Sequence, residues 1–209
     1  MVVMLSPVPI HDADPDRHIR ILQAAERAFA RHGFRGASMQ HVAAEARMSA
    51  GNLYRYFGSK EAIVSGLAER DQAALGEDFR TLAEAEDLLP TVEALLRKHL
   101  MDEPVERSRL ALEIWAEAAR NDTVARSCLR MEAECRARLE GAFAARGGPE
   151  GVSAGFAARV MVTVMTGLIR RRAIDPGFDG ANEINLALTI FRALLEGAVK
   201  PGRAEGEPA

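Results

Sequence analysis

Four residues within a stretch of ten could bind a nucleic-acid duplex. Gly51, Asn52 and Arg55 fall on one side of a short helical pattern, and Lys60 follows it. An asparagine amide can hydrogen-bond a base edge, an arginine can pair with guanine or a phosphate, and a glycine lets the backbone approach closely. Lys60 falls in the first turn of the next helical pattern, where a cation is unfavourable unless an anion lies nearby. These residue types predict hydrogen bonds to bases and phosphates.

The helical patterns that must position these residues are short and closely spaced. One apolar face marks a first helix from about 16 to 32, which Gly33 should end. The residues of that face are Ile21, Leu22, Ala25 and Phe29. Ser38, Ser49 and Ser59 are each placed to cap the next helix. Two short helices joined by a tight turn are the arrangement of a helix-turn-helix, whose second helix enters the major groove of DNA.

Within the third helical pattern, side chains separate into an inward and an outward group. At 100° per residue, Leu53 and Phe57 face inward together, while Tyr56 lies beside the outward residues. Tyr54 falls at the edge of the buried face, so it is either a phosphate contact or a core aromatic. Arg55 is either a DNA contact or a solvated charge.

Charge is distributed unevenly along the chain. The whole chain has a formal net charge of -3, yet residues 17–60 hold eight Lys or Arg against Glu26 and Glu45, a formal +6. A basic segment joined to an acidic remainder indicates a polyanionic partner for the basic segment alone.

Several other functional classes find no support. The five histidines form no pair at metal-ligand spacing, and no Ser-His-Asp, metal or Gly-rich phosphate motif can be assembled, so we expect no metal, no cofactor and no enzyme activity. Cys128 and Cys135 lie about 10 Å apart on a helix, too far for a disulfide, and indicate a reducing compartment. A secretion signal and an apolar run of membrane-spanning length are both missing. A cytoplasmic protein is expected.

The rest of the chain is also helical in pattern. Residues 59 to about 85 predict a long fourth helix, and breaker-rich segments separate the later helical periods. Those periods cover about 90–101, 105–120, 123–146, 153–174 and 182–198. The cations Arg170, Arg171 and Arg172 close the fourth of these periods, where we expect either a solvated helix end or contacts with acidic residues of a partner subunit.

The stretch from Ile21 to Ile63 resembles the DNA-binding domain of the TetR family of bacterial transcriptional regulators. The matching features include the Ala-Ala and Phe of the first helix, the Gly-Phe after it, the Ser38 start and the run "LYRYFGSKEAI". The segment "LALEIWAEAARNDTVARSCLRMEAECRARL" is less specifically similar to the C-terminal domain of choline-betaine-type regulators of that family. The resemblance implies an all-helical homodimer that represses transcription, with a C-terminal domain that binds an inducer.

The resemblance also implies which residues contact DNA. The matching positions are Ser38, Gln40, Ser49, Ala50, Gly51, Asn52, Tyr54 and Lys60, with Tyr54 and Lys60 mainly on phosphates. One position departs from the family, because Arg47 stands where a glycine is usual in the turn. A left-handed turn would cost a non-glycine residue about 1 kcal/mol there. Arg47 also adds a charge near the DNA.

The two helices nearest the carboxyl end are expected to form the dimer interface. Both are more apolar around their circumference than a surface helix needs to be, and small residues there permit close approach. The residues concerned are Val160, Thr163, Val164 and Gly167 on one helix, and Leu186, Ile190, Ala193, Leu194 and Gly197 on the other.

The middle helices carry methionine and aromatic side chains that could line a ligand pocket, unless they are ordinary core. These candidates are Phe79, Met101, Leu112, Trp115, Cys128, Met131, Phe143 and Met165. Trp115 between Glu113 and Glu117 would suit a cationic ligand.

The sequence thus predicts an all-α protein of about nine helices. Residues 16–62 form a helix-turn-helix DNA-binding domain and residues 63–198 a ligand-binding and dimerisation domain, between disordered tails at 1–15 and 199–209. The expected function is a homodimeric repressor that a small-molecule inducer releases from a near-palindromic operator. Two alternatives stay open: an acidic domain that binds a protein in place of a small ligand, and activation in place of repression.

Overall fold

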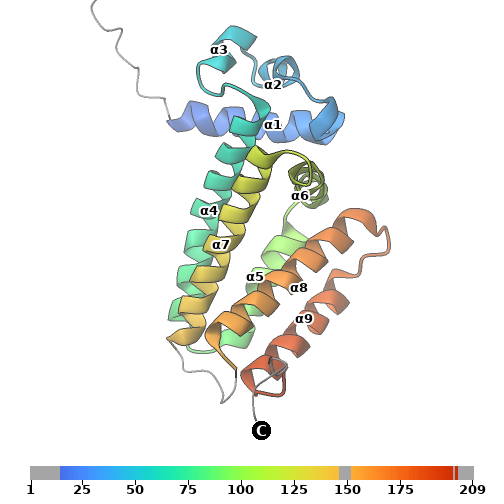
Figure 1. Ribbon diagram of the computed structural model, residues 1–209. Coiled ribbons are helices and arrows are strands. Elements are labelled where there is room, and N and C mark those ends of the chain that lie inside the picture. Colours follow the sequence, from blue (N-terminus) through green and yellow to red (C-terminus); the bar gives the residue numbers. More distant parts are fainter. Residues whose placement is uncertain (1–14, 146–151, 200, 202–209) are drawn as a thin grey trace, which may run out of the picture.

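The computed structural model describes residues 15–145, 152–199 and 201. Within those ranges the chain forms nine α-helices and one π-helical turn, with no strand, so the predicted all-α fold of about nine helices is confirmed (Figure 1). The elements are α1 (Pro15–Gly36), α2 (Met39–Glu45), α3 (Ala50–Tyr54), α4 (Lys60–Glu84), α5 (Leu88–Arg97), η1 (Lys98–Asp102), α6 (Val105–Ala118), α7 (Asp122–Ala144), α8 (Ala154–Ile174) and α9 (Gly180–Leu195).

Three serines cap the starts of α2, α3 and α4. The oxygens of Ser38, Ser49 and Ser59 each accept a hydrogen bond, at 3.2 Å, from the backbone N–H three residues later. Each bond satisfies a donor that the helix itself cannot pair. The predicted caps are therefore confirmed.

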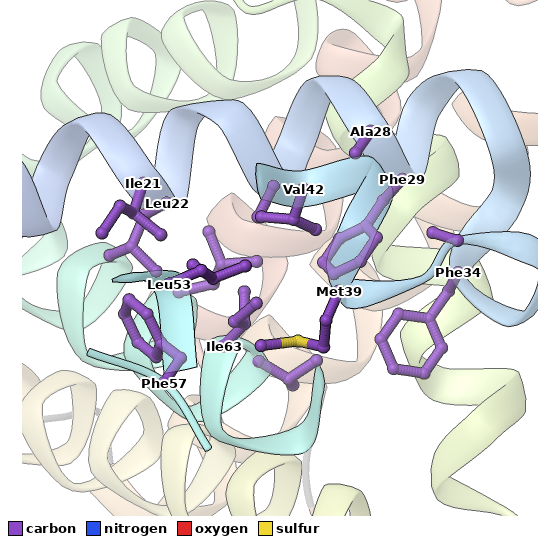
Figure 2. Close-up of a cluster of buried hydrophobic side chains, with 14 of the residues drawn as sticks. Ile21, Leu22, Ala28, Phe29, Phe34, Met39, Val42, Leu53, Phe57 and Ile63 are labelled. Carbon is purple, nitrogen blue, oxygen red and sulfur yellow. The ribbon is translucent and has the colours of Figure 1, made fainter. Parts of the chain in front are cut away.

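The first hydrophobic core holds α1 to α3 against the start of α4. Ile21, Val42, Leu53 and Ile63 are completely buried, and Phe29 is 1% exposed. Figure 2 shows these side chains converging from the four helices. The core extends along α4 to Leu67. Leu110 of α6 and Val124 of α7 also belong to it. Helices as short as α2 and α3 are stable only through this packing.

Glycine ends the regular part of α1. Gly33 has φ 68° and ψ 155°, in the left-handed half of backbone space that glycine enters without steric cost. A short turn of helix follows it to Gly36. The predicted end of the first helix at Gly33 is confirmed.

The remaining helices form the body of the molecule, which we define as everything from the middle of α4 onward. α4 packs against α7, α7 against α8, α6 against α8, and α5 against α9 (Figure 1). A second hydrophobic core lies among them, built around residues such as Leu96, Phe143, Ile184 and Phe191. No helix among the described residues combines the length and apolarity needed to cross a membrane.

The predicted helix over 90–101 is split in two. α5 ends at Arg97 and the chain widens into the π-helical turn η1. Arg172 of α8 explains the widening, because its guanidinium donates to the carbonyl oxygens of His99, at 3.3 Å, and of Glu103. Arg172 also donates to Ser108 at 3.2 Å and is only 9% exposed. The expectation that Arg172 belongs to a solvated helix end was wrong.

Helix α9 starts and stops a few residues earlier than predicted. The carboxylate of Asp179 accepts from the N–H groups of Ala181 and Asn182, so the helix begins at Gly180. Gly197, at φ 71°, ends it with bonds back to the last turn.

Most of the predicted tails, 1–15 and 199–209, and the predicted break at 147–151 lie outside the described residues. The predicted domain boundary at 62 falls inside α4, which is continuous from Lys60 to Glu84. That boundary stays a prediction.

Candidate nucleic-acid interface

Helix α3 presents an open outward face. Leu53 is completely buried and Phe57 is 4% exposed, so the predicted inward pair is confirmed. On the other side, Gly51 and Arg55 are exposed, Tyr54 is 53% exposed and Asn52 is half-buried. A Cβ atom added to Gly51 would meet no atom within 4 Å. Another molecule can therefore approach the α3 backbone closely at this point.

Ala50, the first residue of α3, and Tyr56, two residues after its end, lie differently from the outward group. Tyr56 is half-buried and packs against the first core, so its expected place beside the outward residues was wrong. Ala50 is also half-buried against that core. Tyr54 is not a core aromatic, because more than half of its surface is exposed.

The start of α2 lies beside α3 and carries Ser38 and Gln40. Gln40 is exposed and Ser38 is half-buried. His41 Nδ1 accepts a hydrogen bond from the Ser38 N–H at 3.3 Å, which completes a capping box. The His41 ring also stacks on His32 with 4.1 Å between centroids. Sequence reasoning missed this role of His41, although the Ser-x-x-His spacing resembles the usual Ser-x-x-Glu pattern.

The turn between α2 and α3 has the left-handed backbone that the sequence suggested. Arg47 has φ 53°, and among the described residues it is the one non-glycine residue with positive φ. Its N–H donates to the carbonyl oxygen of Ala44 at 3.1 Å, and the Met48 N–H donates to Ala43 at 2.9 Å. Arg47 therefore bears a backbone strain that glycine would avoid, and its side chain is exposed.

Lys60 is bound within the protein. Its ammonium donates to the carbonyl oxygens of Phe34 at 2.8 Å and Arg35 at 3.3 Å, and it lies 4.9 Å from the centroid of the Phe34 ring. These carbonyls belong to the end of α1, which carries partial negative charge. The cation is therefore stabilised within the protein by groups of partial negative charge, although it lies in the first turn of α4. One of its three N–H donors stays available for a phosphate.

The predicted ligand-pocket residues do not gather in one place. Phe79, Phe143 and Met165 pack in or against the second core, whereas Cys128 packs against the first, and Met101 is 46% exposed on η1. Leu112 and Trp115 of α6 and Met131 of α7 differ from these, because they are half-buried and belong to neither core. Burial raises the pKa of the Cys128 thiol, which suits a packed and unreactive cysteine.

Polar contacts join α1 to α4 and to α6. Arg70 of α4 holds both oxygens of Glu26 of α1, at 2.9 and 2.7 Å. The Phe34 N–H at the end of α1 donates to the carboxylate of Glu113 on α6. This bond connects α6 directly to the end of α1.

Two family models match successive parts of the chain. Residues 21–67 match the family model for bacterial regulatory proteins of the tetR family, and residues 84–199 match the model for the C-terminal part of BetI-type transcriptional repressors. The second match alone covers more than half of the chain.

Individual relatives are also HTH-type transcriptional regulators. The HTH-type transcriptional regulator UidR of Escherichia coli is 36% identical over 115 residues, which are 54% of this chain and 57% of UidR, so the chain spans little more than half of that relative. An uncharacterized HTH-type transcriptional regulator of Mycobacterium tuberculosis is 28% identical over 90% of both chains.

Solved structures share the whole fold. Salmonella enterica GusR superposes with a TM-score of 0.74 at 26% identity, covering 88% of this chain and 97% of GusR. SmeT, solved as a complex with triclosan, has a TM-score of 0.73 at 19% identity over 93% of this chain and all of SmeT, which shows the fold alone. The protein belongs to the TetR family of bacterial regulatory proteins, and is a helix-turn-helix transcriptional regulator and not an enzyme.

Proposed function

We propose that the protein is a cytoplasmic homodimeric repressor, which a small-molecule inducer releases from a near-palindromic operator. The open outward face of α3 carries the proposal. It joins an exposed glycine and an amide on a helix whose start is capped by Ser49, and an exposed arginine at the end of that helix.

Each residue of this face has a separate task in the proposal. Asn52 hydrogen-bonds a base edge in the major groove, and Gly51 lets α3 approach the bases. Tyr54 and Arg55 hold phosphates on either side of α3. Ser38, Gln40 and Ser49 add phosphate contacts from the starts of α2 and α3, and Lys60 contributes its remaining N–H. Arg47 brings a further charge beside Ser49.

The outer faces of α8 and α9 support dimer formation. Leu186 is 53% exposed and Ile174 is 55% exposed, so both have apolar surface that a partner could cover. A Cβ atom added to Gly167 would meet nothing within 4 Å, so a second helix could pack closely there. Val160, Thr163, Val164, Ile190 and Ala193 are also at least partly exposed. Leu194 lies in the second core and Gly197 lies beyond the end of α9, so neither belongs to the proposed interface.

A site for the inducer is proposed beside Leu112, Trp115 and Met131. These apolar side chains are only half-covered and lie on α6 and α7, which pack against each other. A ligand seated there would push on α6, and Glu113 of α6 accepts the N–H of Phe34 at the end of α1. The ligand acts only by binding one of the two arrangements of α6 more tightly than the other.

Duplex binding tests the proposal. Fluorescence anisotropy with the promoter fragment of the protein's own gene should give a log–log salt slope of about -0.9 per phosphate contacted. Asn52→Ala should lose about 1–3 kcal/mol of preference for that fragment over random duplex. Arg130→Gln, on the exposed face of α7, is the control and should bind as the wild type does. A salt-independent response, or equal preference in the Asn52 variant, would overturn DNA reading by α3.

The inducer part has its own test. A screen of small molecules by thermal shift should find a ligand whose stabilisation is lost in Trp115→Ala and which releases the bound fragment. Release by a protein from a cell extract, with no small-molecule hit, would favour the alternative of a protein partner. Loss of expression from the promoter on deletion of the gene would favour activation.

A further inference from the structure

A row of arginines runs along the surface of α1. Arg17, Arg20, Arg27 and Arg31 recur at intervals that place them on one side of the helix. From Arg17 to Arg31 the row spans about 21 Å at 1.5 Å per residue. Each of the four side chains lines the same depression in the surface.

This depression has a volume of about 850 Å³ and lies between α1 and the turn after α2. Arg47, in the turn, lines its other side and brings the number of lining arginines to five. Glu45 is the one acidic residue of the lining, and it pairs with Arg27, at 3.5 Å, and with Arg31. We name the depression with its five arginines the arginine groove.

The charge of the arginine groove is only partly neutralised within the protein. Among the described residues neither Arg17 nor Arg47 has an acidic partner, and Arg20 donates to the backbone oxygen of Asp16 at 3.3 Å. Arg17 also lies in the first turn of α1, where a cation opposes the helix dipole. Arg47 adds backbone strain at φ 53°. Both arginines therefore cost stability in the free protein and suit a polyanion.

We propose that the arginine groove binds the sugar-phosphate backbone of the operator outside the base pairs that α3 reads. The inference rests on the proposed function and extends it. Arg47 is two residues before Ser49, the cap of α3, so the groove borders the reading helix. The five residues of α3 cover about 7.5 Å, which is the length of about two base pairs of duplex. The arginine row, at about 21 Å, is as long as about six base pairs. The row is therefore too long to serve only the bases beneath α3.

A pair of variants isolates the groove from the rest of the interface. Arg17→Gln/Arg20→Gln removes two groove charges without touching α3 or the pairs of Glu45. Arg130→Gln/Arg136→Gln removes two exposed arginines of α7 and makes the same change in net charge. All proteins are full-length, and thermal unfolding with size-exclusion chromatography checks that fold and oligomeric state are unchanged.

The measurement is anisotropy on two duplexes, namely the bound promoter fragment and a version trimmed to the base pairs whose substitution weakens wild-type binding. On the longer duplex the salt slope of the groove variant should be smaller in magnitude by about 3.6, because the two substitutions remove four phosphate contacts per dimer. Its deficit in affinity relative to wild type should then shrink by about a hundredfold between 50 and 200 mM salt. On the trimmed duplex the deficit should largely disappear, and the α7 control should match wild type on both.

Three outcomes overturn the proposal. A groove variant with the wild-type slope on the longer duplex shows that the arginines do not touch DNA, even though α3 reads it. Wild-type protein that binds no duplex removes the proposed function together with this inference. Inorganic tripolyphosphate that stabilises wild type but not the groove variant, with duplex binding equal in both, assigns the groove to a small polyanion.

Discussion

The ammonium of Lys60 donates a hydrogen bond to the carbonyl oxygen of Phe34 at 2.8 Å, so the first residue of α4 closes the end of α1. Lys60→Ala should remove this bond and leave the carbonyls of α1 without a cation. Because hydrogen bonds to a charged group contribute about 1.5–3 kcal/mol, we expect a loss of about 2 kcal/mol in the free energy of unfolding, measured by urea titration.

Lys60→Arg is the control, because a guanidinium can still donate to Phe34 and should keep most of the stability. Should Lys60→Ala instead unfold at the wild-type urea concentration while its duplex salt slope falls by about 1.8, for one phosphate per protomer of the dimer, Lys60 would be a phosphate contact alone.

The strained turn at Arg47 gives a second prediction. Arg47→Gly should raise the free energy of unfolding by about 1 kcal/mol, because glycine takes φ 53° without steric cost. The same variant should bind duplex more weakly, because it loses a groove charge. Urea unfolding and anisotropy measure the two effects separately. Arg47→Ala keeps the strain and loses the charge, so a stability gain of equal size in that variant would contradict the backbone explanation.

Much of the amino-terminal part could be predicted from sequence, for local reasons. The serine caps and the inward faces of α1 and α3 depend on neighbours within four residues, and periodicity reports such contacts. Arg172 shows the limit. A triplet of arginines at a helix end is typical of a solvated end, but the buried bonds of Arg172 to His99 and Glu103 join residues about seventy positions apart, which no local pattern encodes.

The ligand-pocket candidates were unpredictable for a related reason. Residue type alone selected Cys128 and Phe143. Both lie on α7, yet Cys128 packs against the first core and Phe143 lies in the second. Which core a helix face meets depends on the packing of α4, α6 and α8 around α7. For Leu112, Trp115 and Met131 the pocket stays a prediction.

Gly66 marks the closest approach of α4 to the helix-turn-helix. A Cβ atom there would lie 2.8 Å from a ring carbon of Phe57 and 3.1 Å from Leu22. Gly66→Ala should therefore cost about 1–3 kcal/mol of stability, as overpacked cores do, and loosen the support of α3. Gly141→Ala, at an exposed position of α7 with nothing within 4 Å, should stabilise by about 0.5–1 kcal/mol. Differential scanning calorimetry of both variants checks the contrast, and equal shifts would refute the close approach.

The cluster around η1 predicts a pH-dependent stability. His99 Nδ1 bonds Glu103 at 3.1 Å and Nε2 bonds Asp78 at 2.9 Å, while Lys98 also holds Asp78 and Arg107 also holds Glu103. The bond to Glu103, followed by that to Asp78, raises the pKa of His99 above 6.5 against the opposing effect of burial. Protonated His99 therefore stabilises the fold at and below pH 6.5, and this contribution is lost as the pH rises through the raised pKa.

Urea unfolding at a series of pH values measures this loss, whose slope is at most about 1.4 kcal/mol per pH unit for one proton. His99→Gln should flatten the profile above pH 6.5, and Glu103→Gln should shrink the change, because it removes the largest cause of the raised pKa. An unaltered profile in His99→Gln would show that another group titrates there.

The exposed side chain of Leu186 tests the proposed dimer. Leu186→Arg places a charge on the outer face of α9, where a partner could not solvate it, so light scattering should report a monomer. The fold itself should hold, since Leu186 is 53% exposed in the isolated chain. Operator binding should also collapse, because only a dimer presents two reading helices about 34 Å apart. Leu129→Arg makes the same change at a 64% exposed position of α7 and should leave both the dimer and the binding intact. A Leu186 variant that stays dimeric would move the interface away from α9.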